Sequence, residues 1–188
     1  MKIKNSIIQK NIIALTEKLL FKHGIRGWNM DTVAHEAGMA KNTLYKIIGT
    51  KEQLIEKIII SRLRANIDMI VGIFKREPEF LKAVDIGSRQ LAHGISEDNP
   101  LVLTQVFREY PAIKEKFDSI SAKLSTSIHD YLNRAKRSGI IRKDIDNDIL
   151  ISLVTAIINH FISQNYKGKD FEERMYKAFT YLLKGILK

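Results

Sequence analysis

The sequence predicts an all-α protein of about nine helices, made of an N-terminal three-helix head and a C-terminal helical bundle. Apolar residues recur at the helical spacing of three or four along almost the whole chain. No stretch alternates with the period of two that marks a strand, and no Asn-Gly hairpin turn occurs. With 188 residues and 45% hydrophobic composition, the chain can bury a core without disulfides.

The N-terminal part predicts three helices and the start of a long fourth one. The first helix has one apolar stripe, formed by Ile8, Ile12, Leu15 and Leu19. It should end near His23-Gly24, because glycine can adopt the left-handed conformation of a C-cap. Residues 30–48 should form two short helices broken at Gly38, and a long helix should cover about 51–75. We expect a head over residues 1–50 and a second domain over 51–188.

Proline and glycine divide the remaining sequence into further helices. Pro78 should lie in the first turn of one helix and Pro111 in the first turn of another. A turn at 96–100, Ser138-Gly139 and a turn at 167–170 should separate the others. The expected helices cover about 78–93, 100–109, 111–138, 146–166 and 171–187.

Residues 149–166 contain no formal charge, which raises the question of a membrane span. A span needs about 20 apolar residues, and this stretch includes a polar stripe of Ser152, Thr155, Asn159 and Ser163. We expect a helix buried on two sides instead, between its own core and a second subunit. The predicted homodimer interface comprises Leu153, Ile157, Phe179, Leu182 and Leu183.

Charge and cysteine content narrow the possible functions. The net charge is +10 and the pI about 9.7, and residues 1–50 hold 8 basic but only 3 acidic side chains. A basic surface attracts nucleic-acid phosphates or anionic lipid. The absence of cysteine excludes disulfides and thiol chemistry, and no apolar signal segment follows the basic N-terminus. We therefore expect a cytoplasmic protein.

The stretch from Trp28 to Lys46 predicts a helix-turn-helix. Asn29 suits the N-cap of the first short helix, and Gly38 suits the tight turn. The residues expected to face inward are Met30, Val33, Ala34, Ala37, Met39, Leu44 and Ile47. Two short helices joined at a steep angle by a glycine-containing turn form this motif.

The second of these helices should present Lys41, Asn42, Thr43, Tyr45 and Lys46 outward. These side chains are hydrogen-bond donors or cations, and none is acidic. The N-terminal residues of a recognition helix contact base edges in the major groove. The pattern favours DNA binding over a plain helical corner in a bundle.

Several of these segments together resemble the N-terminal domain of TetR-family transcriptional regulators. Residues 37–45 read Ala-Gly-Met-Ala-Lys-Asn-Thr-Leu-Tyr, and residues 49–54 read Gly-Thr-Lys-Glu-Gln-Leu. The family usually has Ala-Gly-Val-Ser-x-x-Thr-Leu-Tyr, then Phe, then Ser-Lys-Glu-x-Leu. This chain departs from it at Ala40, where Ser is common, and at Ile47-Ile48, where the family has an aromatic pair.

The resemblance implies roles for individual residues. Tyr45 and Lys51 match positions that touch phosphates, Thr32 is a further phosphate donor, and Lys41, Asn42 and Lys46 are candidates for base edges. The complete candidate DNA-binding set is Asn29, Thr32, Lys41, Asn42, Thr43, Tyr45, Lys46 and Lys51. The resemblance also implies a small apolar or amphipathic effector in the C-terminal domain. Candidate pocket residues are Phe107, Tyr110, Phe117, Tyr131, Asn159 and His160.

Enzymatic and metal-dependent functions find little support in the sequence. Residues 144–148 imitate the start of a calcium loop, but Ile149 and Thr155 stand where such a loop needs Gly and Glu. No phosphate-binding loop or nucleophile elbow occurs. We expect no enzyme activity, no cofactor and no metal.

The sequence thus predicts a TetR-like regulator, a repressor that binds a palindromic DNA operator as a homodimer and responds to a ligand. One alternative is a dimeric DNA-binding protein without an effector. Another is a basic helical adaptor that binds protein or an anionic membrane.

Overall fold

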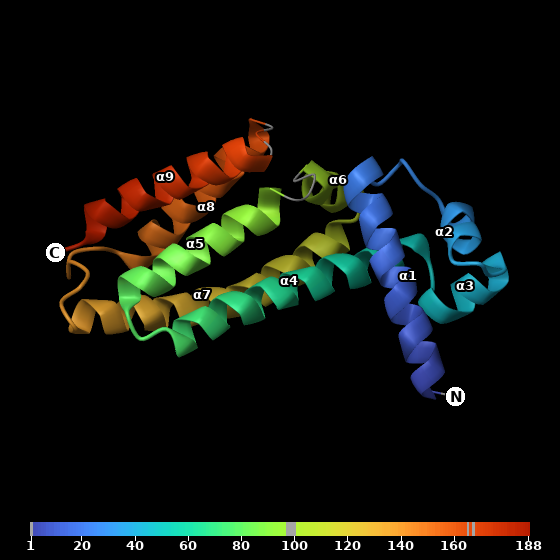
Figure 1. Ribbon diagram of the computed structural model, residues 1–188, viewed down its shortest axis with the longest axis horizontal. Coiled ribbons are helices and arrows are strands. Elements are labelled where there is room, and N and C mark those ends of the chain that lie inside the picture. Colours follow the sequence, from blue (N-terminus) through green and yellow to red (C-terminus); the bar gives the residue numbers. More distant parts are fainter. Residues whose placement is uncertain (1, 97–100, 165, 167) are drawn as a thin grey trace. The chain divides into compact units, whose positions relative to one another are not determined.

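The computed structural model describes residues 2–96, 101–164, 166 and 168–188. Within these residues it contains nine helices and no strand, which confirms the all-α prediction (Figure 1). The only pairing of the strand type among them is an isolated antiparallel bridge between Ile141 and Leu187. The helices are α1 Lys2–His23, α2 Met30–Glu36, α3 Lys41–Ile48, α4 Lys51–Arg76, α5 Phe80–Ser96, α6 Leu101–Glu109, α7 Pro111–Arg137, α8 Asn147–Ser163 and α9 Gly168–Ile186.

The chain forms two compact units. Unit 1 comprises residues 1–64 and 102–118, and unit 2 comprises 65–101 and 119–188. Helices α4 and α7 each contribute residues to both units. Unit 1 therefore contains more than the first three helices, since α6 and the start of α7 belong to it.

Unit 1 is built around one hydrophobic cluster that joins α1–α4 to α6 and α7. Its largest fully buried side chains include Leu20, Leu44, Ile48, Ile58 and Ile113. Both Leu44 and Ile48 come from α3, at the helical spacing of four that puts them on one face. The opposite side of α3 is consequently left at the surface.

The α2–α3 corner is fixed by local hydrogen bonds. Asn29 accepts hydrogen bonds from the backbone N–H groups of Asp31 and Thr32, each at 2.9 Å, which confirms it as the N-cap of α2. Gly38 has φ 63°, a value that costs glycine nothing because it has no Cβ. Met39 N then donates to Ala34 O at 3.0 Å and closes the turn. The predicted helix-turn-helix is therefore present (Figure 1).

Unit 2 holds two further hydrophobic clusters. Helix α9 packs along α5 and α8, and buries Phe171, Met175 and Phe179. In the other cluster Tyr131 stacks between Phe74, at 4.2 Å between ring centroids, and Phe80, at 5.3 Å. Helices α4, α5 and α7 are joined by this aromatic stack.

Some helix ends differ from the prediction. Helix α5 begins at Phe80, so Pro78 precedes its first turn, and the Glu77 carboxylate accepts a hydrogen bond from the backbone N–H of Glu79 at 3.2 Å. Helix α8 ends at Ser163, three residues before the predicted end. Most of the predicted turn at 96–100 lies outside the described residues. No helix in the described part of the chain is long and apolar enough to cross a membrane.

Candidate nucleic-acid interface

The exposed side of α3 brings together most of the predicted DNA-binding residues. Lys41, Asn42, Thr43, Tyr45 and Lys46 are all exposed, and Tyr45 keeps 41% of its surface accessible. The burial of Leu44 and Ile48 fixes which side of the helix turns outward. The side chain of Ile48, which is 1% exposed, fills the core position where the family has an aromatic residue.

The two predicted residues near α2 take part in its cap. Besides the two backbone donors, the Asn29 side-chain oxygen accepts a hydrogen bond from the Thr32 hydroxyl at 3.2 Å. This oxygen is therefore occupied by the protein's own groups. Both residues lie near the surface, Asn29 exposed and Thr32 half-buried, and their contact with DNA stays a prediction.

An acidic residue that the sequence analysis did not single out lies next to α3. Asp31, in the first turn of α2, forms an ion pair of 2.8 Å with the ammonium of Lys41. Its hydrogen bond and its charge raise the pKa of Lys41. The signal in the sequence was an acidic residue in the first turn of α2, where a negative charge also interacts favourably with the helix dipole.

Lys51 lies in unit 1, where it is half-buried and its ammonium contacts the protein's own backbone. Its ammonium donates hydrogen bonds to Ile25 O at 2.7 Å and Trp28 O at 2.9 Å. The same nitrogen lies 4.4 Å from the centroid of the Trp28 ring. Burial lowers the pKa of Lys51, with the charge of Glu109 acting in the opposite direction.

The structure does not bring the six predicted effector residues into one pocket. Phe107, Tyr110 and Phe117 pack against the core of unit 1, where the first and last of these rings meet edge to face at 5.1 Å. Tyr131 is part of the aromatic stack in unit 2. Asn159 and His160 are exposed on α8. Aromatic residues in these helices were needed for the core, so their presence did not mark a cavity.

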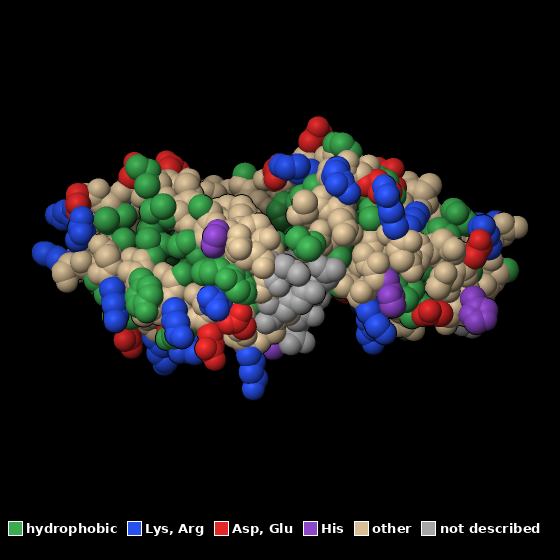
Figure 2. Space-filling view, turned by 90° about the horizontal axis from the view of Figure 1, so that it is seen from above, with side chains coloured by type: hydrophobic (Ala, Val, Ile, Leu, Met, Phe, Trp, Pro, Cys, Tyr) green, Lys and Arg blue, Asp and Glu red, His purple; other side chains and the backbone are tan. Residues whose placement is uncertain are grey.

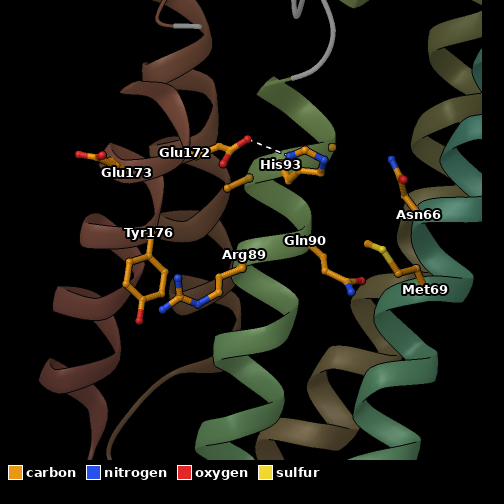
Figure 3. A pocket seen from close by; sticks show the side chains of 10 residues that line it. Asn66, Met69, Arg89, Gln90, His93, Glu172, Glu173 and Tyr176 are labelled. Carbon is orange, nitrogen blue, oxygen red and sulfur yellow. Dashed lines mark hydrogen bonds and ion pairs between the residues drawn. The ribbon is translucent and has the colours of Figure 1, made fainter. Parts of the chain in front are cut away.

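A groove of about 610 Å³ lies in unit 2 and involves other residues (Figure 3). It is lined by Asn66 and Met69 of α4, by Arg89, Gln90 and His93 of α5, and by Glu172 of α9 (Figure 3). On one side of α5, His93 contacts the Glu172 carboxylate at 2.9 Å. The lining is completed by Ala92, Gly94, Glu173 and Tyr176.

The five predicted dimer-interface residues differ in exposure. Leu153 is 46% exposed, whereas Phe179 is buried and Ile157, Leu182 and Leu183 are half-buried in the unit's own clusters. Phe179 therefore belongs to the core, because the apolar stripe of α9 faces α5 and α8. Two further apolar side chains of this unit are exposed, Ile149 of α8 at 62% and Tyr181 of α9 at 68%. Figure 2 shows hydrophobic side chains gathered on the surface of this unit.

The fold is that of a helix-turn-helix protein, and its α3 presents an exposed, donor-rich face. Residues 12–58 match the model of the bacterial regulatory proteins of the tetR family. Comparison with curated protein sequences gave no match.

Solved structures of TetR-family regulators share the fold over nearly the whole chain. PfmR from Thermus thermophilus has a TM-score of 0.76 at 19% identity, covering 94% of this chain and 99% of its own. A regulator from Agrobacterium tumefaciens has a TM-score of 0.80 at 10% identity, and the match covers 98% of this chain and 100% of that regulator. FadR from Bacillus subtilis, in complex with stearoyl-CoA, has a TM-score of 0.75 at 16% identity, and the match covers 93% of this chain and 97% of FadR. Residues 12–58 thus resemble the N-terminal domain of the tetR family, and nearly the whole chain shares the fold of solved TetR-family regulators.

Proposed function

We propose that this protein is a repressor that binds a palindromic DNA operator as a homodimer and is released by a small effector. The observation that carries the proposal is the exposed, donor-rich side of α3 in a helix-turn-helix that matches the TetR family. Two such heads would contact half-sites about 34–36 Å apart, or a multiple of that distance. The protein would act in the cytoplasm, by binding and without enzymatic activity.

Different residues of the head would have different tasks. Asn42 and Lys46 are suited to base edges, since Asn can pair with adenine and Lys with guanine. Tyr45 and Thr43 can donate hydrogen bonds to phosphates, which position the protein without specifying sequence. Lys41 can contribute once its ammonium leaves Asp31. In this proposal residues 1–50 contact DNA, and residues 51–188 bind effector and partner subunit.

The exposed apolar residues of α8 support the homodimer. Ile149 and Leu153 are four residues apart and so lie on one face of α8, and both are largely accessible in the single chain. An isologous contact would place this face of each subunit against the same face of the other. Linking two heads in this way raises operator affinity far above that of one head.

The effector is proposed to be a small apolar or amphipathic molecule. The groove along α5 offers Met69 beside the polar groups of Gln90 and Asn66 on its α4 side, and the Tyr176 ring beside Arg89 on its α9 side (Figure 3). Stearoyl-CoA, the ligand of the similarly folded FadR, is the first probe to use. An effector can shift DNA binding only by its different affinity for two states of the protein.

Duplex binding by fluorescence anisotropy tests the DNA function. We expect binding that weakens steeply with salt, and no comparable binding to anionic lipid vesicles. With a selected operator, Asn42→Ala and Lys46→Ala should each relax preference at one or two positions, by about 1–3 kcal/mol. Tyr45→Phe should weaken binding to all DNA sequences alike.

Three other outcomes would change the proposal. Binding to vesicles but not to DNA would favour the basic adaptor. If every variant lost the same affinity for the operator and for random DNA, Asn42 and Lys46 would not be base-contacting residues. Operator binding that neither stearoyl-CoA nor other acyl compounds alters, with no change in thermal stability, would favour a regulator without an effector.

A further inference from the structure

Two lysines of α4 direct their ammonium groups at the backbone of the DNA-binding head. Lys51 lies at the start of α4 and Lys57 six residues later, and both are half-buried. All the contacts described below lie within unit 1. Together these lysines contact the segment before α2 and the end of α3, the two ends of the helix-turn-helix.

Lys51 holds the segment that leads into α2. Its two acceptors, Ile25 O and Trp28 O, flank a short loop whose side chains Ile25 and Trp28 are 3% and 4% exposed. Trp28 directly precedes the N-cap Asn29, so the position of its carbonyl sets where α2 begins. An ammonium has three N–H donors, and Lys51 uses two of them on these carbonyls while it faces the Trp28 ring.

Lys57 holds the end of the recognition helix. Its ammonium donates to Ile48 O at 2.9 Å, and Ile48 is the last residue of α3. The last carbonyls of a helix lack partners within the helix and carry partial negative charge. A cation at this position donates a hydrogen bond to the free carbonyl and interacts favourably with the helix dipole.

The connection between α3 and α4 is short, and local hydrogen bonds fix its geometry. Gly49 has φ 89°, and a Cβ built there would lie 1.9 Å from the Gln53 side-chain oxygen. That oxygen accepts a hydrogen bond from Thr50 N at 2.9 Å, and Gln53 N donates to the Thr50 hydroxyl at 3.2 Å. This reciprocal capping box fixes the start of α4. The two lysines therefore project from a helix whose start is fixed relative to α3.

We propose that Lys51 and Lys57 are positioning residues for DNA binding, which hold the two ends of the helix-turn-helix and do not contact phosphates. The proposal rests on the proposed DNA-binding function and adds to it. For Lys51 it replaces the phosphate contact that the family resemblance implies. Loss of either contact lowers the fraction of heads in the binding-competent arrangement, and the apparent dissociation constant rises by the same factor.

The salt dependence of DNA binding separates positioning from phosphate contact. Each lysine that neutralises a phosphate adds about one unit to the slope of log K against log salt. The variants are Lys51→Met and Lys57→Met, which keep an apolar stem but lose the donor. Lys46→Met, on the exposed side of α3, is the matched control, and Lys57→Arg restores a cationic donor.

We expect Lys51→Met and Lys57→Met to weaken binding roughly tenfold, to operator and random duplex alike, with an unchanged slope. Lys46→Met, which removes an exposed cation from the DNA face itself, should lower the slope and relax the preference for the operator, and Lys57→Arg should recover most of the affinity. A slope reduced by one unit in Lys51→Met or Lys57→Met would overturn the positioning role of that residue. Unchanged affinity and slope would overturn it equally.

Hydrogen exchange of the free protein provides a readout that does not need DNA. Gly49 N donates to Tyr45 O at 2.9 Å in the last turn of α3, and this amide should exchange faster in Lys57→Met than in the unsubstituted chain. The amides of α5 serve as the internal control. If the unsubstituted chain shows no salt-dependent DNA binding, the proposed function fails, while unchanged exchange at Gly49 refutes the Lys57 contact separately.

Discussion

Asp31 and Lys41 join the first turns of α2 and α3 through an ion pair of 2.8 Å. Both side chains are largely exposed, at 64% and 52%, so the pair lies on the surface of the head. One acid thus offsets one of the cations that the proposed DNA contact needs. Before Lys41 can approach a phosphate or a base, its ammonium must leave this carboxylate.

Removal of the acid should therefore strengthen DNA binding. In Asp31→Asn the Lys41 ammonium no longer has an anionic partner, and the head gains one net positive charge. We expect severalfold tighter binding to random duplex at low salt and a slope steeper by about one unit. Fluorescence anisotropy over a series of salt concentrations measures both quantities.

Asp68→Asn is the matched control for this change. It alters net charge equally but lies in unit 2, on an exposed position of α4. If the two variants shift the affinity and the slope by the same amount, the effect of Asp31→Asn is one of net charge and not of the ion pair.

The exposed face of α8 should carry the dimer contact. Leu153→Glu places a charge where the single chain leaves 46% of the side chain accessible, so the subunit should keep its helical content. We expect a monomer of about 21.6 kDa by light scattering, with operator binding much weakened. Leu183 is less suitable for this test because it is half-buried against the core of unit 2.

Leu81→Glu provides a comparison at similar exposure. Leu81 is 40% exposed on α5, and a charge there should leave the dimer intact. A monomeric unsubstituted chain at micromolar concentration would show that the α8 face does not form a dimer.

Asp85 should contribute stability that depends on pH. Its carboxylate accepts hydrogen bonds from Arg89 at 3.0 Å and from the Tyr176 hydroxyl of α9 at 2.7 Å, and these contacts lower the pKa of Asp85 below its ordinary 3.8. The stabilisation is thus fully present above pH 3.8 and is lost as the pH falls through the lower folded-state pKa. Since the side chain is 43% exposed, solvent screening limits the contribution to ~1 kcal/mol or less.

The measurement is the free energy of unfolding of the protein and of Asp85→Asn at a series of pH values. The difference between them should be constant near neutral pH and should shrink below pH 3.8. A difference that stays constant throughout acid titration would argue against a role for the ionised carboxylate.

The hydroxyl of Tyr131 should be dispensable for stability. It is buried and has no hydrogen-bond partner among the described residues, and burial raises the pKa of Tyr131. Tyr131→Phe keeps the stack with Phe74 and Phe80 and removes the unsatisfied group, so the free energy of unfolding should rise by up to ~1 kcal/mol. Urea denaturation checks this, with Tyr181→Phe at the exposed surface as the control. A marked loss of stability in Tyr131→Phe would mean that the hydroxyl has a stabilising partner.

Local signals in the sequence predicted the head well. Asn29 is a cap because its short side chain reaches the first amides of α2, and Gly38 is a turn because it tolerates positive φ. Such rules depend on neighbours within four residues. For the same reason the end of α3 and the start of α4 were located correctly.

Contacts between distant residues could not be predicted in this way. The ammonium of Lys51 lies at the end of a flexible chain, and its acceptor Ile25 O is 26 residues away. A basic residue at that position is compatible with a phosphate contact or an internal one, and only the packing decides. Likewise, nothing local distinguishes Phe107, a core ring of unit 1, from a ring that lines a cavity.

Ala40 links the folding of the recognition helix to its use. It occupies the N-cap of α3 and offers no side-chain hydrogen bond to the first turn. Ala40→Ser would add a cap worth about 1 kcal/mol, so the protein forgoes stability that a single substitution could supply. The oxygen of that serine would occupy the first-turn amides, the same groups that a helix N-terminus offers to an anion. A single hydroxyl at this position would therefore exchange the availability of the first-turn amides of α3 for thermal robustness.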